Sequence, residues 1–308
     1  MSNLTRKLGL LDVFCIASGA MVSSGLFVLP GLAHAQAGPA VIFSYFFAGI
    51  LATTGMLSVA EIITAMPKAG GDYFFITRTM GPAAGTAAGI LSWFSLALKS
   101  SFALVGMAAF LVLVVPINPL LISTGTCLLF IFLNILGVKE ASRLQVFLVI
   151  GLLVLMILYV VFGSGAVQTE LLVPFIPMGW DAVFSTTGFV FVSYGGLLNI
   201  AAIAEEVKDP GKVIPRGMIL SLVIIVVLYT MMVFITAGVL PAEQLDNSLT
   251  PISDGAAVFL GRMGWRVMTV AALLAFVSTA NAGLMSASRY LLSLSRDGLI
   301  PSVLGKVN

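Results

Sequence analysis

Two clusters of small and polar residues interrupt long apolar stretches of this sequence. The first is Ser23-Ser24-Gly25, and the second is Gly195-Gly196, preceded by Ser193 and Tyr194. An unwound helix within hydrocarbon frees backbone N–H and C=O groups, which must find polar partners. Freed N–H groups suit a carboxylate, and freed carbonyls suit an ammonium or a metal cation. The clusters therefore predict a site for a small polar ligand; the alternative is close packing, which small residues also mark in membrane helices.

Three further side chains could carry chemistry. Lys99 lies deep within an apolar stretch, where an ionisable residue is by default a functional candidate. Desolvation favours its neutral form, so it could gain and lose a proton; the alternative is that it reaches water or a carboxylate in a vestibule. Ser278 and Thr279 could supply hydroxyl oxygens to Na⁺, a hard cation, or could bond their own helix backbone.

The composition indicates where these residues must work. Of 308 residues, 59% are apolar and 9% are charged, whereas a soluble domain carries about 25% charged residues. This excludes a soluble enzyme, a nucleic-acid binder and a disordered chain. Cys15 and Cys127 lie in apolar stretches and His34 is the single histidine, so the sequence offers no metal cluster and predicts no cofactor. We expect an all-α polytopic membrane protein.

A helix that crosses about 30 Å of hydrocarbon needs roughly 20 apolar residues. Eight stretches qualify: 10–35, 39–64, 83–113, 117–137, 144–163, 182–204, 216–240 and 265–294. The loops between them predict a cytoplasmic N-terminus, because twelve Lys and Arg residues then lie inside and two outside. The sequence therefore predicts a multi-pass protein of the cell membrane, in contact with the lipid bilayer, and sets no oligomeric state.

The two interruptions also predict an internal repeat. Gly25 and Gly196 are 171 residues apart, and each falls about 15 residues into its span. Five spans precede the second interrupted one, and an odd number per repeat inverts its topology. We divide the chain into a first repeat at 1–165 and a second at 166–308. Paired interruptions at matching positions indicate a transporter site near the bilayer midplane.

Four segments, in this order and spacing, resemble the amino-acid/polyamine/organocation (APC) superfamily of permeases. They are the first interruption running into Phe27–Gly31, the segment Glu61–Tyr73, Glu206–Pro210 with Ile214–Arg216, and Ser295–Gly298 with Pro301. The resemblance implies the LeuT-like five-plus-five inverted-repeat fold. It also implies secondary transport of an amino acid or related amine, by ion-coupled symport or exchange.

The resemblance assigns roles to individual residues. It implies that the N–H groups of Ser23, Ser24 and Gly25 hold the substrate carboxylate. The amino group would bind carbonyls near the two interruptions, at Met21, Val192 and Gly195, with Gly196 beside them. Tyr194 would cover the substrate, with Phe191 as second choice, although both could simply pack in the core. Lys99, on helix 3, could contact substrate or carry the coupling proton. The helix-5 lysine of some proton-coupled relatives is absent from 148–153, so H⁺ and Na⁺ both stay open.

One feature departs from the family. Adding 171 to helices 4 and 5 (117–163) places their counterparts at 288–334, so we expect an incomplete second repeat without helices 9 onward. A non-transporting fragment or accessory subunit is therefore an alternative to a permease. A channel needs ring-like selectivity elements that the sequence does not repeat. A membrane enzyme would need acid and base groups that the spans lack.

Overall fold

The chain forms long helices wherever its sequence is apolar. The computed structural model describes residues 4–112 and 117–305. Within them the longer elements are α1 (Leu10–Met21), α2 (Ser24–Phe27), α3 (Leu29–Ala37), α4 (Val41–Ala65), α5 (Asp72–Met80), α6 (Pro82–Val112), α7 (Pro119–Leu136), α8 (Val138–Gly163), α9 (Gly179–Phe191), the 3₁₀ helix η4 (Val192–Glu206), α10 (Pro210–Val239), α11 (Ala242–Asp246) and α12 (Pro251–Arg296). Short 3₁₀ turns join them at 38–40, 164–166, 169–172 and 302–305.

Seven helical segments within the described residues are long and apolar enough to cross a membrane. They confirm a polytopic α-helical protein and match seven of the eight predicted spans. The first predicted span, 10–35, is instead divided among α1, α2 and α3, and α1 alone has only 12 residues. Residue 113, the predicted end of the third span, and Lys306 lie outside the described residues.

Proline and glycine set most of the helix boundaries. Pro82, Pro119, Pro210 and Pro251 each begin a helix, the position where a missing N–H costs nothing. Gly261, with a φ of 59°, divides α12 into a short helix and a long one. The amphipathic helix α5 was not predicted.

The first interruption is present where the sequence places it. Val22 has a ψ of 109° and Ser23 a φ of −157°, so the helix stops after Met21 and resumes at Ser24. We call Val22–Ser23 the break. A second discontinuity at Val28 follows from Pro30, whose ring disfavours a continuous helix through the preceding turn. The helix is therefore interrupted immediately before Ser24, as predicted.

The second interruption differs from the prediction of an unwound backbone near Gly195. The helix passes from α to 3₁₀ at Val192 and stays 3₁₀ through Glu206, without a non-helical residue between. A 3₁₀ run of 15 residues is long, because most end after three or four. Gly196 lies against the end of α1, where an added Cβ would be 1.9 Å from the Ala20 carbonyl oxygen. Gly196 thus serves the close approach of η4 to α1 rather than an open gap.

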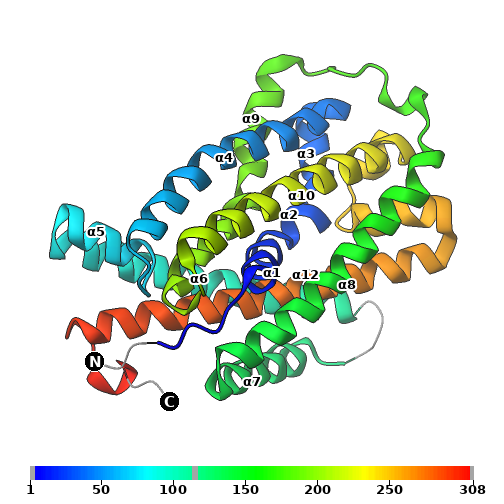
Figure 1. Cartoon of the computed structure of the whole chain (residues 1–308). Helices are drawn as coiled ribbons and strands as arrows, with labels where there is room; N and C mark the ends of the chain where they lie inside the picture. The colour runs from blue at the N-terminus through cyan, green and yellow to red at the C-terminus, as the bar shows by residue number, and fades with distance from the viewer. Residues whose placement is uncertain (1–3, 113–116, 306–308) are drawn as a thin grey trace.

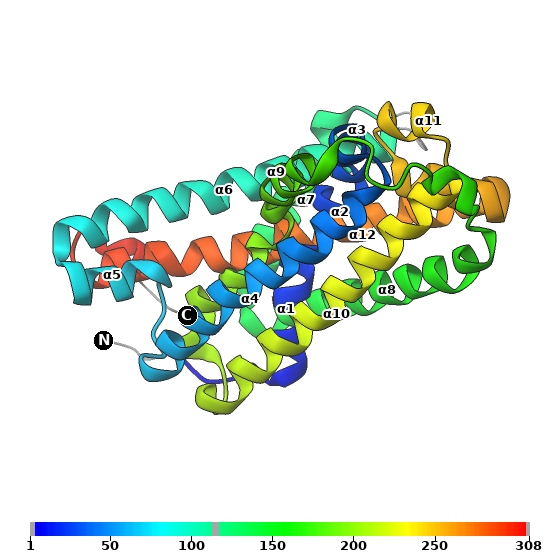
Figure 2. The same ribbon diagram turned by 90° about the horizontal axis from the view of Figure 1, so that it is seen from above.

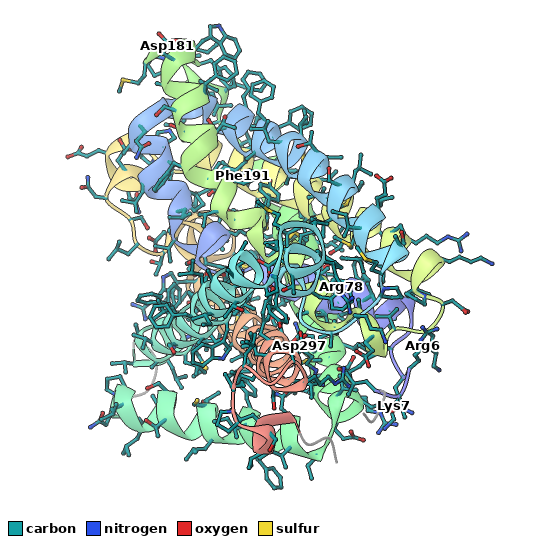
Figure 3. All side chains as sticks on the ribbon, turned by 90° about the vertical axis from the view of Figure 1, so that its left-hand side faces the viewer. Arg6, Lys7, Arg78, Asp181, Phe191 and Asp297 are labelled. Atoms are coloured by element: carbon teal, nitrogen blue, oxygen red, sulfur yellow. The ribbon has the colours of Figure 1, made fainter. Side chains whose placement is uncertain are left out.

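The broken helix occupies the middle of the bundle. α1 contacts α10, η4, α8 and α12, and Figure 2 shows it beneath the crossing helices α4 and α10. α6 and α12 run side by side along much of their length (Figures 1 and 2). The helix α5 and the C-terminal end of α12 lie at one end of the bundle (Figure 1), and Figure 3 looks onto that end. The break therefore lies deep inside the protein, between α6, η4 and α12.

The adjacent glycines of η4 provide a test of this packing. We expect Gly196→Ala to destabilise the protein strongly, because its Cβ would overlap the α1 backbone and overpacking costs about 1–3 kcal/mol or more. The measurement is the melting temperature of the purified protein in detergent. Gly195→Ala is the matched control, since no atom lies within 4 Å of a Cβ there. Equal melting temperatures for the two variants would contradict the close contact.

Candidate functional site

A cavity of about 1040 Å³ lies beside the break. Its wall is built by the broken helix, α6, η4 and the middle of α12, and it extends to Leu249 and Thr250 in the loop before α12. It brings together eight residues that the sequence singled out: Met21, Ser23, Ser24, Gly25, Lys99, Val192, Gly195 and Thr279.

Four other predicted residues lie elsewhere. Tyr194 is 2% exposed and does not line the cavity; its hydroxyl donates to the Tyr45 carbonyl at 2.9 Å. Gly196 and Ser278 are buried behind the wall, against α1. Phe191, labelled in Figure 3, is 43% exposed on the outside of the bundle. Neither aromatic ring covers the cavity in this structure.

The hydroxyls of α12 bind carbonyls of the broken helix. Thr279 Oγ1 donates to the carbonyl oxygens of Gly19 and Val22, at 2.9 and 3.0 Å. Ser278 Oγ lies 3.2 Å from the Gly19 oxygen and 2.9 Å from that of Ala275 in its own helix. Ser278 thus bonds its own helix backbone, as one interpretation predicted, whereas the interpretation of these residues as Na⁺ ligands stays a prediction. Two hydroxyl and two carbonyl oxygens converge here, the ligand type that a hard cation requires.

Lys99 also reaches the broken helix. Its Nζ donates to the Ala20 carbonyl oxygen at 3.0 Å, so its partner is the end of α1 rather than a carboxylate. The last carbonyls of a helix carry partial negative charge, and a cation near them is favourable. Lys99 therefore places its amino group between the break and the cavity.

Two buried tyrosines hold the opposite side of the break, and the ring of a third, Tyr194, lies beside them. Tyr229 donates to the Met21 carbonyl oxygen at 3.0 Å, and Tyr45 donates to that of Gly25 at 2.7 Å. The ring of Tyr229 lies 5.4 Å from that of Tyr194 and 6.0 Å from that of Tyr45. Hydrogen bonds of this kind are needed because an unpaired carbonyl in an apolar interior costs about 1–3 kcal/mol.

The N–H groups of the break are in the opposite situation. Ser23, Ser24 and Gly25 line the cavity, and none of the hydrogen bonds among the described residues uses their backbone N–H groups. The carbonyls beside them are occupied, whereas these three donors, in residues that line the cavity, have no partner among the described residues. This arrangement suits an anionic oxygen, such as a carboxylate, which accepts hydrogen bonds from several donors.

Two features of the cavity were not predicted from the sequence. Asn199 lies in the wall of the cavity and is 6% exposed. It could have been predicted as a candidate, because it is a polar residue within an apolar stretch. Phe102, Phe110 and Phe276 also line it. Phe102 follows Lys99 by three residues, so helical periodicity could have placed both on one face.

Ion pairs close the end of the bundle that faces the viewer in Figure 3. Glu206 binds Arg289 at 2.7 Å, and Glu205 binds Arg296 at 2.9 Å; both glutamates are buried. Glu205 also accepts from the N–H groups of Leu4 and Ala69, at 3.2 and 3.1 Å. These bonds tie the end of η4 to α12, the N-terminal segment and the loop after α4.

The same end carries a tyrosine–carboxylate contact outside the spans. Tyr73, on α5, donates its hydroxyl to Asp297 after the end of α12. Burial and the hydrogen bond to the Asp297 carboxylate raise the pKa of Tyr73 to about 12. The phenol is therefore neutral and acts as a donor over the physiological pH range.

A bundle of membrane-spanning helices with an interrupted helix beside an internal cavity is the architecture of a secondary transporter. The comparisons agree: the profile of the family described as "Amino acid permease" matches residues 12–308. The chain belongs to the amino acid permease family. It is accordingly a multi-pass membrane transport protein and not an enzyme.

Similar proteins cover nearly the whole chain. The branched-chain amino acid permease BcaP of Lactococcus lactis is 32% identical over 96% of this chain and 70% of its own length. BcaP of Bacillus subtilis is 29% identical over 99% of this chain and 70% of its length. The solved structure of a Na⁺-coupled sialic acid symporter aligns with a TM-score of 0.68 and 14% identity, over 94% of this chain and 67% of that one. The last likeness concerns the fold alone and supports the LeuT-like architecture.

The tyrosine contacts with the break yield a prediction. We expect Tyr229→Phe to raise the KM for the transported molecule several-fold, because the Met21 carbonyl loses its partner and the break is held less firmly. Tyr159→Phe is the control: Tyr159 is equally buried, but its hydroxyl pairs with Thr236 Oγ1 at 2.7 Å, away from the break. Both variants should lose about 1–3 kcal/mol of stability. If both also changed KM alike, the tyrosine would be no more than a core residue.

Proposed function

We propose that this protein carries a neutral amino acid across the cell membrane by alternating access around the break. The observation that carries the proposal is that Ser23, Ser24 and Gly25 line a cavity of about 1040 Å³ and that their backbone N–H groups have no partner among the described residues. The substrate carboxylate binds these donors. Its amino group lies toward the carbonyls of Met21, Val192 and Gly195.

The cavity wall supports a neutral substrate. It contains one ammonium group, that of Lys99, and among the described residues no Asp or Glu lines it. A cationic side chain would find no counter-ion there, and burying an unpaired charge is costly. The phenylalanines at 102, 110 and 276 offer apolar surface to the rest of the substrate. Two of the similar proteins are branched-chain amino acid permeases, and branched-chain amino acids are neutral.

The closed end of the bundle supports alternating access. The cavity extends to Leu249 at one end, whereas the Glu205–Arg296 and Glu206–Arg289 pairs tie the helices together at the other. With a cytoplasmic N-terminus, this arrangement is open toward the outside. Separation of these pairs would then release the substrate inward.

A coupling ion completes the proposal, and two places could serve it. Lys99 could carry a proton, because its ammonium lies between the break and the cavity. Na⁺ could instead bind the oxygens of Ser278, Thr279, Gly19 and Val22 if the two hydroxyls turned their hydrogens away.

The carboxylate site can be tested by deleting a single N–H group. Ser24 is the first residue of α2, a position that tolerates proline, so Ser24→Pro removes the donor without breaking the helix. We expect KM for amino acid uptake into proteoliposomes to rise about tenfold or more, since a hydrogen bond to a charged group is worth about 1.5–3 kcal/mol. Ser24→Ala, which keeps the N–H, should transport nearly normally. Unchanged uptake by Ser24→Pro would count against the site, and no uptake of any amino acid by the unaltered protein would refute the proposed function.

The coupling ion has a separate test with two variants. If Lys99 carries a proton, Lys99→Met should abolish the pH dependence of uptake while any sodium dependence stays. If the α12 hydroxyls bind Na⁺, Thr279→Val should abolish the stimulation of uptake by a sodium gradient and leave the pH profile intact. Uptake in both variants is measured against pH and against Na⁺ concentration. A variant with unaltered ion dependence removes its residue from the coupling mechanism.

A further inference from the structure

A second cavity, of about 370 Å³, opens at the closed end of the bundle. Its wall comes from the N-terminal segment, the end of α4 with the loop after it, α5, and Glu205 at the end of η4. Arg6, labelled at this end in Figure 3, and Lys68 both line it. Neither cationic side chain has a hydrogen bond or an ion pair among the described residues. The second cavity therefore offers positive charge to an anionic ligand.

The carboxylate of Glu205 brings these two cations to one place. It accepts hydrogen bonds from the N–H groups of Leu4 at 3.2 Å and Ala69 at 3.1 Å, and so joins the segments that carry Arg6 and Lys68. An arginine of α12 binds the same carboxylate at 2.9 Å. The negative charge of Glu205 is thus already matched within the protein, whereas the charges of the two cations are not.

The position of the second cavity favours a lipid over a soluble anion. The apolar segment that contains α4 ends at Ala65, which lines the second cavity, so this cavity lies at the edge of the hydrocarbon. Farther along α4, the side chains of Ile50, Leu57 and Ile62 are exposed. With a cytoplasmic N-terminus, this edge meets the leaflet whose anionic lipids attract basic segments. An acyl chain can therefore lie along α4 while its headgroup occupies the second cavity.

The surroundings of the second cavity add positive charge and apolar surface. Phe74 of α5 lines it, and the guanidinium of Arg78 lies over the Phe74 ring, 5.3 Å from its centroid. Met80, at the end of the same helix, is 73% exposed. A helix that combines basic and exposed apolar residues is typical of a membrane interface. Glu61, one turn before the end of α4, is exposed but does not line the second cavity.

We infer that the second cavity binds the phosphate headgroup of an anionic phospholipid, with Arg6 and Lys68 as its cationic ligands. Guanidinium and ammonium groups bind phosphate oxygens through charge-assisted hydrogen bonds. A headgroup held by both residues connects the N-terminal segment to the loop after α4, and so stabilises the closed end. This site is separate from the cavity beside the break, and the inference does not depend on which molecule the protein transports.

The experiment measures binding of dioleoylphosphatidylglycerol to the purified full chain by native mass spectrometry. The comparisons are dioleoylphosphatidylcholine, which is zwitterionic, and glycerol phosphate, which is soluble. We expect the unaltered protein to bind the anionic lipid about tenfold more tightly than the zwitterionic one. Arg6→Gln combined with Lys68→Gln should weaken binding of the anionic lipid about tenfold or more. It should also abolish the rise in melting temperature that this lipid produces.

Lys139→Gln combined with Arg143→Gln is the matched control. It also removes one lysine and one arginine, both exposed near the start of α8, and neither lines the second cavity. The change in net charge is the same in the two double variants. We expect the control to bind the anionic lipid as tightly as the unaltered protein does.

Several outcomes would overturn the inference. Equal affinities for the two lipids, or an equal loss of affinity in both double variants, would mean that no specific headgroup site exists. Competition by glycerol phosphate at the concentrations at which the lipid binds would identify a site for a soluble phosphate instead. Should the Arg6 and Lys68 double variant fail to fold, Lys68→Gln alone is compared with Lys139→Gln. A loss in the first only supports the inference, and equal affinities overturn it.

Discussion

The structure depends on hydrogen bonds to the backbone carbonyl groups of one interrupted helix. In surroundings without water, every carbonyl that loses its helical partner needs another donor. The five carbonyls around the break have such donors, each supplied by a side chain from another helix. The donors are Thr279 for the carbonyls of Gly19 and Val22, Lys99 for that of Ala20, Tyr229 for that of Met21, and Tyr45 for that of Gly25. The interruption is thus held by α4, α6, α10 and α12 at once, and the packing of the bundle follows from that requirement.

Among the described residues, the carbonyl groups around the break have hydrogen-bond partners, whereas the N–H groups of Ser23, Ser24 and Gly25 have none. The chemistry of the cavity follows from this difference. The carbonyls are occupied by the protein's own side chains, while the N–H groups of Ser23, Ser24 and Gly25 are left to the cavity. Lys99 adds a positive group on the same side. The site therefore favours an anionic group at the break, and its largely apolar remainder favours a neutral body behind that group.

The sequence predicted the parts of this arrangement that depend on residue type within one segment. Serine and glycine at 23–25 indicated the break. Lys99 was a functional candidate because an ionisable side chain within an apolar stretch usually serves a function. The unwound segment near Gly195 was a wrong prediction, because Gly195-Gly196 permits either a gap or a close approach, and only the packing of η4 on α1 decides between them. The partners of the carbonyls were beyond prediction: Tyr229 and Met21 are separated by 208 residues, and no local pattern links them.

The same bonds constrain any motion that moves a substrate through the protein. Lys99 and Tyr45 belong to the first 165 residues, whereas Tyr229 and Thr279 belong to the rest. Side chains from both parts of the chain therefore hydrogen-bond to the backbone around the break. If one part rocks against the other, at least one pair of these bonds must lengthen or be exchanged. A carboxylate bound to the adjacent N–H groups would hold the break in one conformation. It would therefore change which of these hydrogen bonds breaks first when the helices move. Substrate occupancy and helix movement would then be coupled through the backbone of residues 19–25 itself.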